Sequence, residues 1–170
     1  MNPPPDRGTP SPADDALQRL GTDYIARRVS DCTFRQGLLD IVRERFGCNR
    51  ACLWRRVEGA GTPTWLCVAR WTSDGGHDAG GERVEDDASD DIGAAAATAL
   101  DDAIAAASTR QVALCTLNGH TFGLLSCERA PAGQPWQRRE TAALRRLASA
   151  LSLIVARHEA ARIVDDAPPR

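Results

Sequence analysis

Two short apolar segments joined by Asn118-Gly119 constrain the fold of this chain more than any other feature of its sequence. The stretch from Leu114 to Arg129 reads LCTLNGHTFGLLSCER, and the apolar segments cover residues 111–117 and 121–128. Asn-Gly favours a type I′ turn, because both central positions need a positive φ angle and the twist of this turn matches that of the strands. The sequence therefore predicts an antiparallel β-hairpin near the C-terminal third of the chain.

Two other stretches have the pattern of strands. Residues 49–57 (NRACLWRRV) separate into two alternating sets, one of Ala51, Leu53, Arg55 and Val57 and the other of Cys52, Trp54 and Arg56. Residues 64–71 (TWLCVARW) are expected to place Trp65, Cys67, Ala69 and Trp71 on one side and Leu66 and Val68 on the other. Each strand has apolar residues on both sides, which indicates a sheet covered on two faces.

Two amphipathic helices are predicted before these strands. The first begins at a capping box of Ser11 and Asp14 and extends to about residue 29. Its apolar face consists of Leu17, Leu20 and Tyr24. The second is capped by Ser30 or Asp31 and ends at Gly47, a residue that readily adopts a left-handed helix stop. Its apolar stripe consists of Phe34, Leu38, Ile41, Val42 and Phe46.

The last predicted element is a long helix over residues 136–164. Side chains at intervals of three and four form a heptad seam of Leu144, Leu147, Leu151, Ile154, His158 and Ala161. Leu153 and Val155 widen this apolar arc. We therefore expect the helix to cover the sheet and also to contact another helix.

The chain is expected to form one domain over residues 14–164. Pro, Ser and Asp are frequent in residues 1–13, which predicts a disordered N-terminal tail, and residues 165–170 form a C-terminal tail. Residues 73–92 combine glycines with a run of acids and are predicted to be a flexible loop. Residues 93–108 are rich in alanine and are predicted to be a helix.

Composition and charge exclude several classes of partner. Of the 170 residues, 42% are hydrophobic and 26% charged, and acids and bases are mixed to a net charge of -2. Such a charge distribution has no concentration of basic residues that would attract nucleic acid or an anionic membrane surface. Its apolar runs are too short to span a bilayer, and the N-terminus has prolines and an acid where a secretion signal needs an apolar run. We expect a cytoplasmic protein.

The six cysteines, Cys32, Cys48, Cys52, Cys67, Cys115 and Cys127, lie mostly within apolar strand or helix patterns. None forms a CxxC pair, so their spacing does not predict a zinc site. In a reducing cytoplasm we expect all six to be buried thiols that pack as small hydrophobic side chains. Redox sensing by one of them is the alternative.

No catalytic or metal-binding pattern is apparent in the sequence. His77, His120 and His158 are isolated from other metal-ligating residues, and the acidic run over residues 85–91 lacks the alternating ligand spacing of a calcium loop. No Ser-His-Asp or Cys-His arrangement has a supporting local motif. The sequence therefore predicts neither a metal site nor an enzyme.

The order of elements and three segments resemble the GAF domain family, especially the GAF modules of bacterial sensor kinases and diguanylate cyclases. The segments are FGCNRACLWRRV (46–57), LNGHTFGLLSCER (117–129) and GQPWQRRETAALRRLASALSLI (133–154). In the last of these, Trp136 precedes the final helix and Glu140 follows four residues later. The resemblance covers roughly residues 30–162, and the three motifs in order are more specific than any one alone.

This resemblance implies an α/β fold of the α+β type. It has an antiparallel sheet of about five strands with the hairpin at its centre, and the N- and C-terminal helices lie together on one face. In family members these helices commonly pair two subunits, and the other face holds cyclic nucleotides, tetrapyrroles, haem or small effectors. The resemblance thus implies a homodimer. Its interface candidates are Leu17, Leu20, Tyr24, Leu147, Leu151, Ile154, His158 and Ala161.

No cofactor is evident, but an unknown small ligand is compatible with the resemblance. Four tryptophans in a chain with few other aromatic residues suggest a pocket for a flat ligand, and the pocket candidates are Trp54, Trp71, Cys115 and Cys127. Motifs for cyclic nucleotides are not visible, and no Cys-His dipeptide supports a covalently linked bilin.

The sequence therefore favours a non-catalytic sensory or regulatory domain in bacterial signal transduction. Its partner would be a separate signalling protein or a fused output domain. One alternative is a degenerate GAF domain that serves only as a protein-interaction module. The enzymatic alternative is a thiol-dependent reductase of the free methionine sulfoxide type. The cysteines of those enzymes lie between the middle strands, where this chain has none from Cys67 to Cys115.

Overall fold

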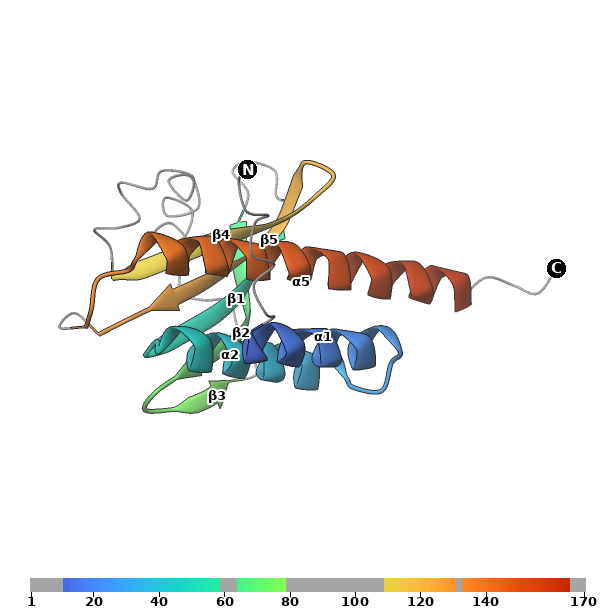
Figure 1. Cartoon of the computed structure of the whole chain (residues 1–170). Helices are drawn as coiled ribbons and strands as arrows, with labels where there is room; N and C mark the ends of the chain where they lie inside the picture. The colour runs from blue at the N-terminus through green and yellow to red at the C-terminus, as the bar shows by residue number, and fades with distance from the viewer. Residues whose placement is uncertain (1–10, 59–63, 79–108, 131–132, 166–170) are drawn as a thin grey trace, which may run out of the picture.

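A computed structural model describes residues 11–58, 64–78, 109–130 and 133–165 (Figure 1). In chain order the elements are α1 (Pro12–Ile25), α2 (Asp31–Phe46), β1 (Arg50–Val57), β2 (Thr64–Thr72), β3 (Gly76–Asp78), β4 (Arg110–Leu117), β5 (His120–Glu128) and α5 (Arg138–Asp165). The strands form one five-stranded antiparallel sheet in the order β3-β2-β1-β5-β4. The predicted α+β class and strand number are confirmed.

The predicted helix signals act as the sequence indicated. The Ser11 side chain accepts a hydrogen bond from the Asp14 N–H, and the Asp14 side chain accepts one from the Ser11 N–H, so the capping box is present. Ser30, the first of the two candidates, caps α2. Gly47 ends that helix with φ 58°, in the left-handed region.

The predicted hairpin is also present, with φ 49° at Asn118 and 80° at Gly119. Leu117 pairs directly with His120, so the dipeptide is the whole loop. The hairpin is not at the centre of the described sheet, however. That position belongs to β1, and β4 lies at an edge.

A β-bulge changes the face assignment that alternation predicted for β2. Leu53 pairs with Ala69 and Trp54 with Cys67, which leaves Val68 without a partner in the register. Because one extra residue exchanges the two faces of a strand, Trp65 and Cys67 lie on the opposite face from Ala69 and Trp71. The prediction that these four share one side is wrong, since it assumed an unbroken register.

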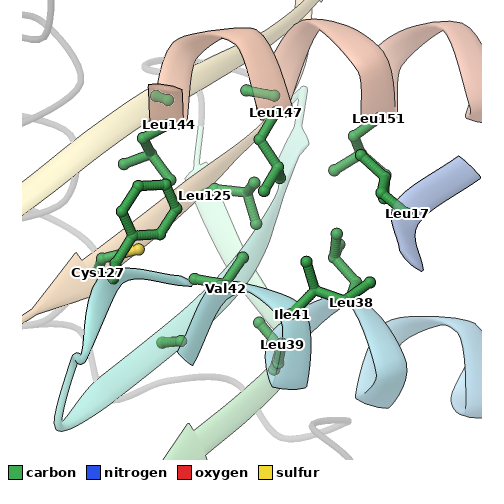
Figure 2. Close-up of a cluster of buried hydrophobic side chains, with 14 of the residues drawn as sticks. Leu17, Leu38, Leu39, Ile41, Val42, Leu125, Cys127, Leu144, Leu147 and Leu151 are labelled. Atoms are coloured by element: carbon green, nitrogen blue, oxygen red, sulfur yellow. The ribbon is translucent and has the colours of Figure 1, made fainter. Parts of the chain in front are cut away.

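Helices α1, α2 and α5 cover one face of the sheet (Figure 1). α2 packs on β1 and β2, α5 packs mainly on β4, and α1 packs on the other two helices. Figure 2 shows Leu144 and Leu147 of α5 directed toward Leu125 of β5, with Val42 of α2 beneath them. This face holds the main hydrophobic core.

Parts of the predicted organisation lie outside the described residues. These are most of the N-terminal tail, the helix at 93–108, the loop from residue 79 onward and the C-terminal tail after residue 165. Within the first part of that loop the structure has strand β3, which the sequence pattern missed because three residues show no periodicity. None of the described helices is long and apolar enough to cross a membrane.

Candidate functional site

The sheet face turned away from α1, α2 and α5 carries the candidate site, and we call it the distal face. Its buried cluster consists of Cys52, Trp54, Trp65, Cys67, Val112 and Leu124, with Leu114 packed against it. Since directly paired residues project from the same face, the strand register arranges this surface in rows. The rows are Thr72–Arg50–Glu128–Arg110, then Arg70–Cys52–Ser126–Val112, then Cys67–Trp54–Leu124–Leu114. The distal face is therefore charged at one end and apolar at the other.

Trp54 is the best-fixed side chain of the distal face. It is 2% exposed, and its indole Nε1–H donates a 2.9 Å hydrogen bond to Oγ of Ser126 on the neighbouring strand. This bond satisfies a buried donor and sets the orientation of the ring. The indole is therefore a buried ring of fixed orientation at the centre of the distal face.

The charged end contains two arginines on strands β1 and β4, with Glu128 of β5 between them. Arg110 Nη2 lies 3.4 Å from Oε2 of Glu128. Arg50 occupies the position between Glu128 and Thr72 in the same row. A ligand with an anionic group would meet its complementary charge here.

The Cys52 and Cys67 thiols lie in one buried cluster on this face, and their pKa values move apart. The neighbouring Cys67 thiol, together with Arg50 and Arg70, lowers the pKa of Cys52 to about 7 despite burial. The same thiol contact, together with burial, raises the pKa of Cys67. Cys52 is therefore the more acidic member of the pair.

The predicted pocket residues do not lie together. Trp54 lies on the distal face, whereas Trp71, Cys115 and Cys127 pack in the helix-covered core. The guanidinium of Arg43 lies over the Trp71 ring, 5.1 Å from its centroid. Cys52 and Ser126 were not predicted as site residues, although counting in twos from Trp54 and along β5 places both on the same face. Trp65 could not have been found in that way because of the bulge.

The predicted dimer residues mostly join helices within one chain. Leu17, Tyr24, Leu147 and Leu151 are buried in the core. Leu20 packs against Gly37 and Ile154 against Gly21. The His158 ring stacks on Tyr24 at 3.9 Å, and its Nδ1 lies 3.0 Å from the Tyr24 carbonyl oxygen. Ala161 is half-buried. This seam connects α1 to α5.

A second stripe on α5 faces solvent along the length of the helix. We call it the outer stripe, and it consists of Ala142, Arg146, Ser149, Leu153, Ala160 and Val164. Leu153 is 56% and Val164 73% exposed, and Ile163 beside them is 68% exposed. The last turns of α5 project beyond the rest of the described domain (Figure 1). Exposed apolar residues on a projecting helix are typical of an association surface.

An ion pair fixes the start of α5 to the end of the sheet. Arg129 Nη2 lies 2.7 Å from Glu140 Oε1, and Nη1 lies 3.2 Å from Oε2. Arg129 also donates to the Phe46 carbonyl oxygen, and its guanidinium lies 4.1 Å from the centroid of the Trp136 ring. The Gln137 N–H donates to Glu140 at 2.9 Å, which caps the helix. We call this group the Arg129 brace.

The prediction that all six cysteines are buried is wrong for Cys32, which is exposed on α2. The other five are buried free thiols. Among the described residues, no group of three or more histidine, cysteine or acidic side chains is placed to hold a metal ion.

Solved structures identify the fold. The chain is similar to the blue-light-absorbing form of the Thermosynechococcus elongatus PixJ GAF domain, with 20% identity, 84% of this chain and 94% of that chain covered, and a TM-score of 0.57. It is also similar to the GAF domain of an Acinetobacter phosphoenolpyruvate-protein phosphotransferase, with 11% identity, 91% and 99% covered, and a TM-score of 0.57. A far-red-absorbing dark-state protein with bound biliverdin IXa gives 19% identity, 85% and 99% covered, and a TM-score of 0.59.

These likenesses show that the chain has the fold of a GAF domain, as the sequence resemblance implied. No protein-family model matches the sequence, and no curated protein matches it.

Proposed function

We propose that this chain is a non-catalytic, cytoplasmic sensory or regulatory GAF domain of bacterial signal transduction. It binds a small molecule over the distal face and acts as a homodimer through α5. The observation that carries this proposal is the composition of the distal face. One side of the sheet is covered by helices, while the other holds a buried, oriented tryptophan near a row of charged residues.

The ligand that fits this face best is a planar ring system with an anionic group. The ring would lie over the cluster that contains Trp54, and the anion would lie toward Arg50, which is two rows away in the sheet register. One structural neighbour is described with bound biliverdin, which is such a molecule. This chain would bind its ligand without a covalent link of the Cys-His type, because its sequence lacks that dipeptide.

Signalling requires that a change at the sheet reaches another molecule. The Arg129 brace ties the end of β5 to the first turn of α5, and the exposed outer stripe runs along α5 to its far end. A second copy of the chain would cover Leu153 and Val164 symmetrically. The receiver would be a separate signalling protein or a fused output domain that contacts the projecting end of α5.

Ligand binding is tested with a panel of biliverdin, haem, cyclic GMP and cyclic AMP. The thermal unfolding temperature and the tryptophan fluorescence of the purified protein are measured with each compound. We expect at least one compound to raise the unfolding temperature in a concentration-dependent way and to change the fluorescence. Arg50→Gln should weaken that effect, whereas Arg162→Gln, on the exposed end of α5, should leave it unchanged.

Two outcomes would change the proposal. If no compound acts and the purified protein contains no extractable ligand, the domain is better explained as a protein-interaction module. If the protein reduces free methionine sulfoxide with a dithiol as reductant, the enzymatic alternative is correct. We expect no such turnover, because Cys52 is only 2% exposed and a substrate as large as free methionine sulfoxide does not reach its sulfur.

A further inference from the structure

Four of the six cysteines lie in two neighbouring pairs around β1. Cys52 on β1 contacts Cys67 on β2 at the distal face. Cys48, just before β1, contacts Cys127 on β5 on the helix-covered side. Packing alone does not require such contacts, because a thiol that only fills space can have apolar neighbours on every side. Cys115 is a thiol of this kind, because burial is the only cause that raises its pKa, to about 12.

The surroundings of Cys52 and Cys67 differ in charge. Arg50 lies two residues before Cys52 on the same face, and Arg70 is its direct partner across the strands. Both positive charges favour a thiolate at Cys52. Cys67 is held as a thiol, and its sulfur also lies 3.4 Å from the Ala69 carbonyl oxygen. One sulfur is thus suited to attack and the other to follow as a proton-bearing thiol.

We propose that Cys52 and Cys67 form a reversible dithiol–disulfide switch that responds to peroxides. The Cys52 thiolate attacks one oxygen of the peroxide and breaks the O–O bond, giving a sulfenic acid and releasing an alcohol or water. The Cys67 sulfur then attacks the sulfenic sulfur, and its proton leaves with the displaced hydroxyl as water. In total, two thiols and one peroxide give one disulfide, one water and one alcohol or second water. A cellular dithiol restores the reduced pair.

The strand register gives this oxidation a structural consequence. Cys52 pairs with Arg70 and Cys67 with Trp54, so the two cysteines are diagonal neighbours and not directly opposite. Diagonal positions lie about 7–8 Å apart between Cα atoms, whereas a disulfide needs about 4.4–6.8 Å. Closing the bond therefore requires β2 to shift along β1 beside the bulge at Val68. Trp54, the direct partner of Cys67, lies at the position where the strands move.

The switch does not depend on the proposed ligand, since its formation is read from the covalent state of the sulfurs. Folded Cys32→Ser protein is used, because the exposed Cys32 would otherwise react first. It is treated with equimolar hydrogen peroxide, chosen for its small size because Cys52 is only 2% and Cys67 4% exposed. Free thiols are then alkylated, and the peptides are identified by mass spectrometry. The unoxidised protein is the reference.

We expect one disulfide that links the peptides of Cys52 and Cys67, a mass lower by two hydrogen atoms, reversal by dithiothreitol and a change in tryptophan fluorescence. Adding Cys67→Ser should leave a sulfenic acid at Cys52 that dimedone traps. Adding Cys115→Ser as a matched control should leave the disulfide unaffected. The idea is overturned if the link forms only between Cys48 and Cys127, or only after unfolding. It also fails if Cys52 and Cys67 remain as fully reduced as Cys115.

Discussion

The Arg129 brace provides a quantitative test of how α5 is attached to the sheet. Glu140 accepts two hydrogen bonds from Arg129, at 2.7 and 3.2 Å, and a third from the Gln137 N–H at 2.9 Å. Glu140→Gln keeps the shape of the side chain but replaces one acceptor oxygen with an NH2 group that faces a donor. The substitution therefore removes charge-assisted hydrogen bonds without creating a cavity.

The size of the effect follows from burial. Removing one member of a buried ion pair costs roughly 3–5 kcal/mol, and a hydrogen bond to a charged group contributes roughly 1.5–3 kcal/mol. The Arg129 and Glu140 side chains are 13% and 26% exposed, so solvent screens the pair in part. We expect Glu140→Gln to lower the free energy of unfolding by about 2–4 kcal/mol. Glu159→Gln on the same helix should cost less than about 1 kcal/mol, because its pair with Arg162 is 52% and 59% exposed.

The same variant should show a pH dependence of known sign. Arg129 as hydrogen-bond donor holds the pKa of Glu140 below its usual value of 4.5. The carboxylate therefore stabilises the fold fully above the unfolded pKa, and this contribution is lost as the pH falls through the lower folded pKa. Urea unfolding followed by circular dichroism at neutral and acidic pH measures this contribution to the free energy of unfolding. Equal losses for Glu140→Gln and Glu159→Gln, or a Glu140→Gln loss that persists unchanged in acid, would refute the reasoning.

Three further substitutions test single contacts by thermal or urea unfolding. Gly119→Val should cost roughly 1–3 kcal/mol because φ is positive there, and an unchanged melt would contradict the turn. Gly21→Ala should cost roughly 1–3 kcal/mol, because its Cβ would lie 2.6 Å from Ile154 Cδ1. Adding Ile154→Val should recover part of that loss if this contact is responsible. Ser126→Ala should cost roughly 1–3 kcal/mol by leaving the Trp54 indole N–H unpaired, and a neutral result would contradict that bond.

Local chemistry was readable from the sequence, and pairing geometry was not. The capping box, the Gly47 stop and the Asn118-Gly119 turn each depend on a few adjacent residues, so a single sequence is enough to predict them. The bulge at Val68 is decided between two strands. A period of two within one strand cannot reveal it, and the face of Trp65 was therefore assigned wrongly.

The seam on α5 shows the same limit at the level of association. A heptad pattern indicates that a stripe of the helix is buried, but it does not indicate which element or chain buries it. Leu147 and Leu151 are buried by the sheet and by α1 and α2 of their own chain, and His158 by Tyr24 of α1. The exposed outer stripe mixes alanine, serine and arginine with two large apolar residues. Because its apolar residues are few, hydrophobic periodicity indicates the neighbouring seam and not the outer stripe.

Sedimentation equilibrium at micromolar concentration measures whether the domain forms a symmetric pair through α5. We predict a mass twice the 18.3 kDa of one chain. Leu153→Glu with Val164→Glu should give a monomer with an unchanged circular dichroism spectrum, because both residues are exposed in one chain and would be buried, charged, in the pair. Arg162→Glu, on the opposite side of the helix, should remain a dimer. A monomeric unmodified protein, or a double variant that stays dimeric, would contradict the account.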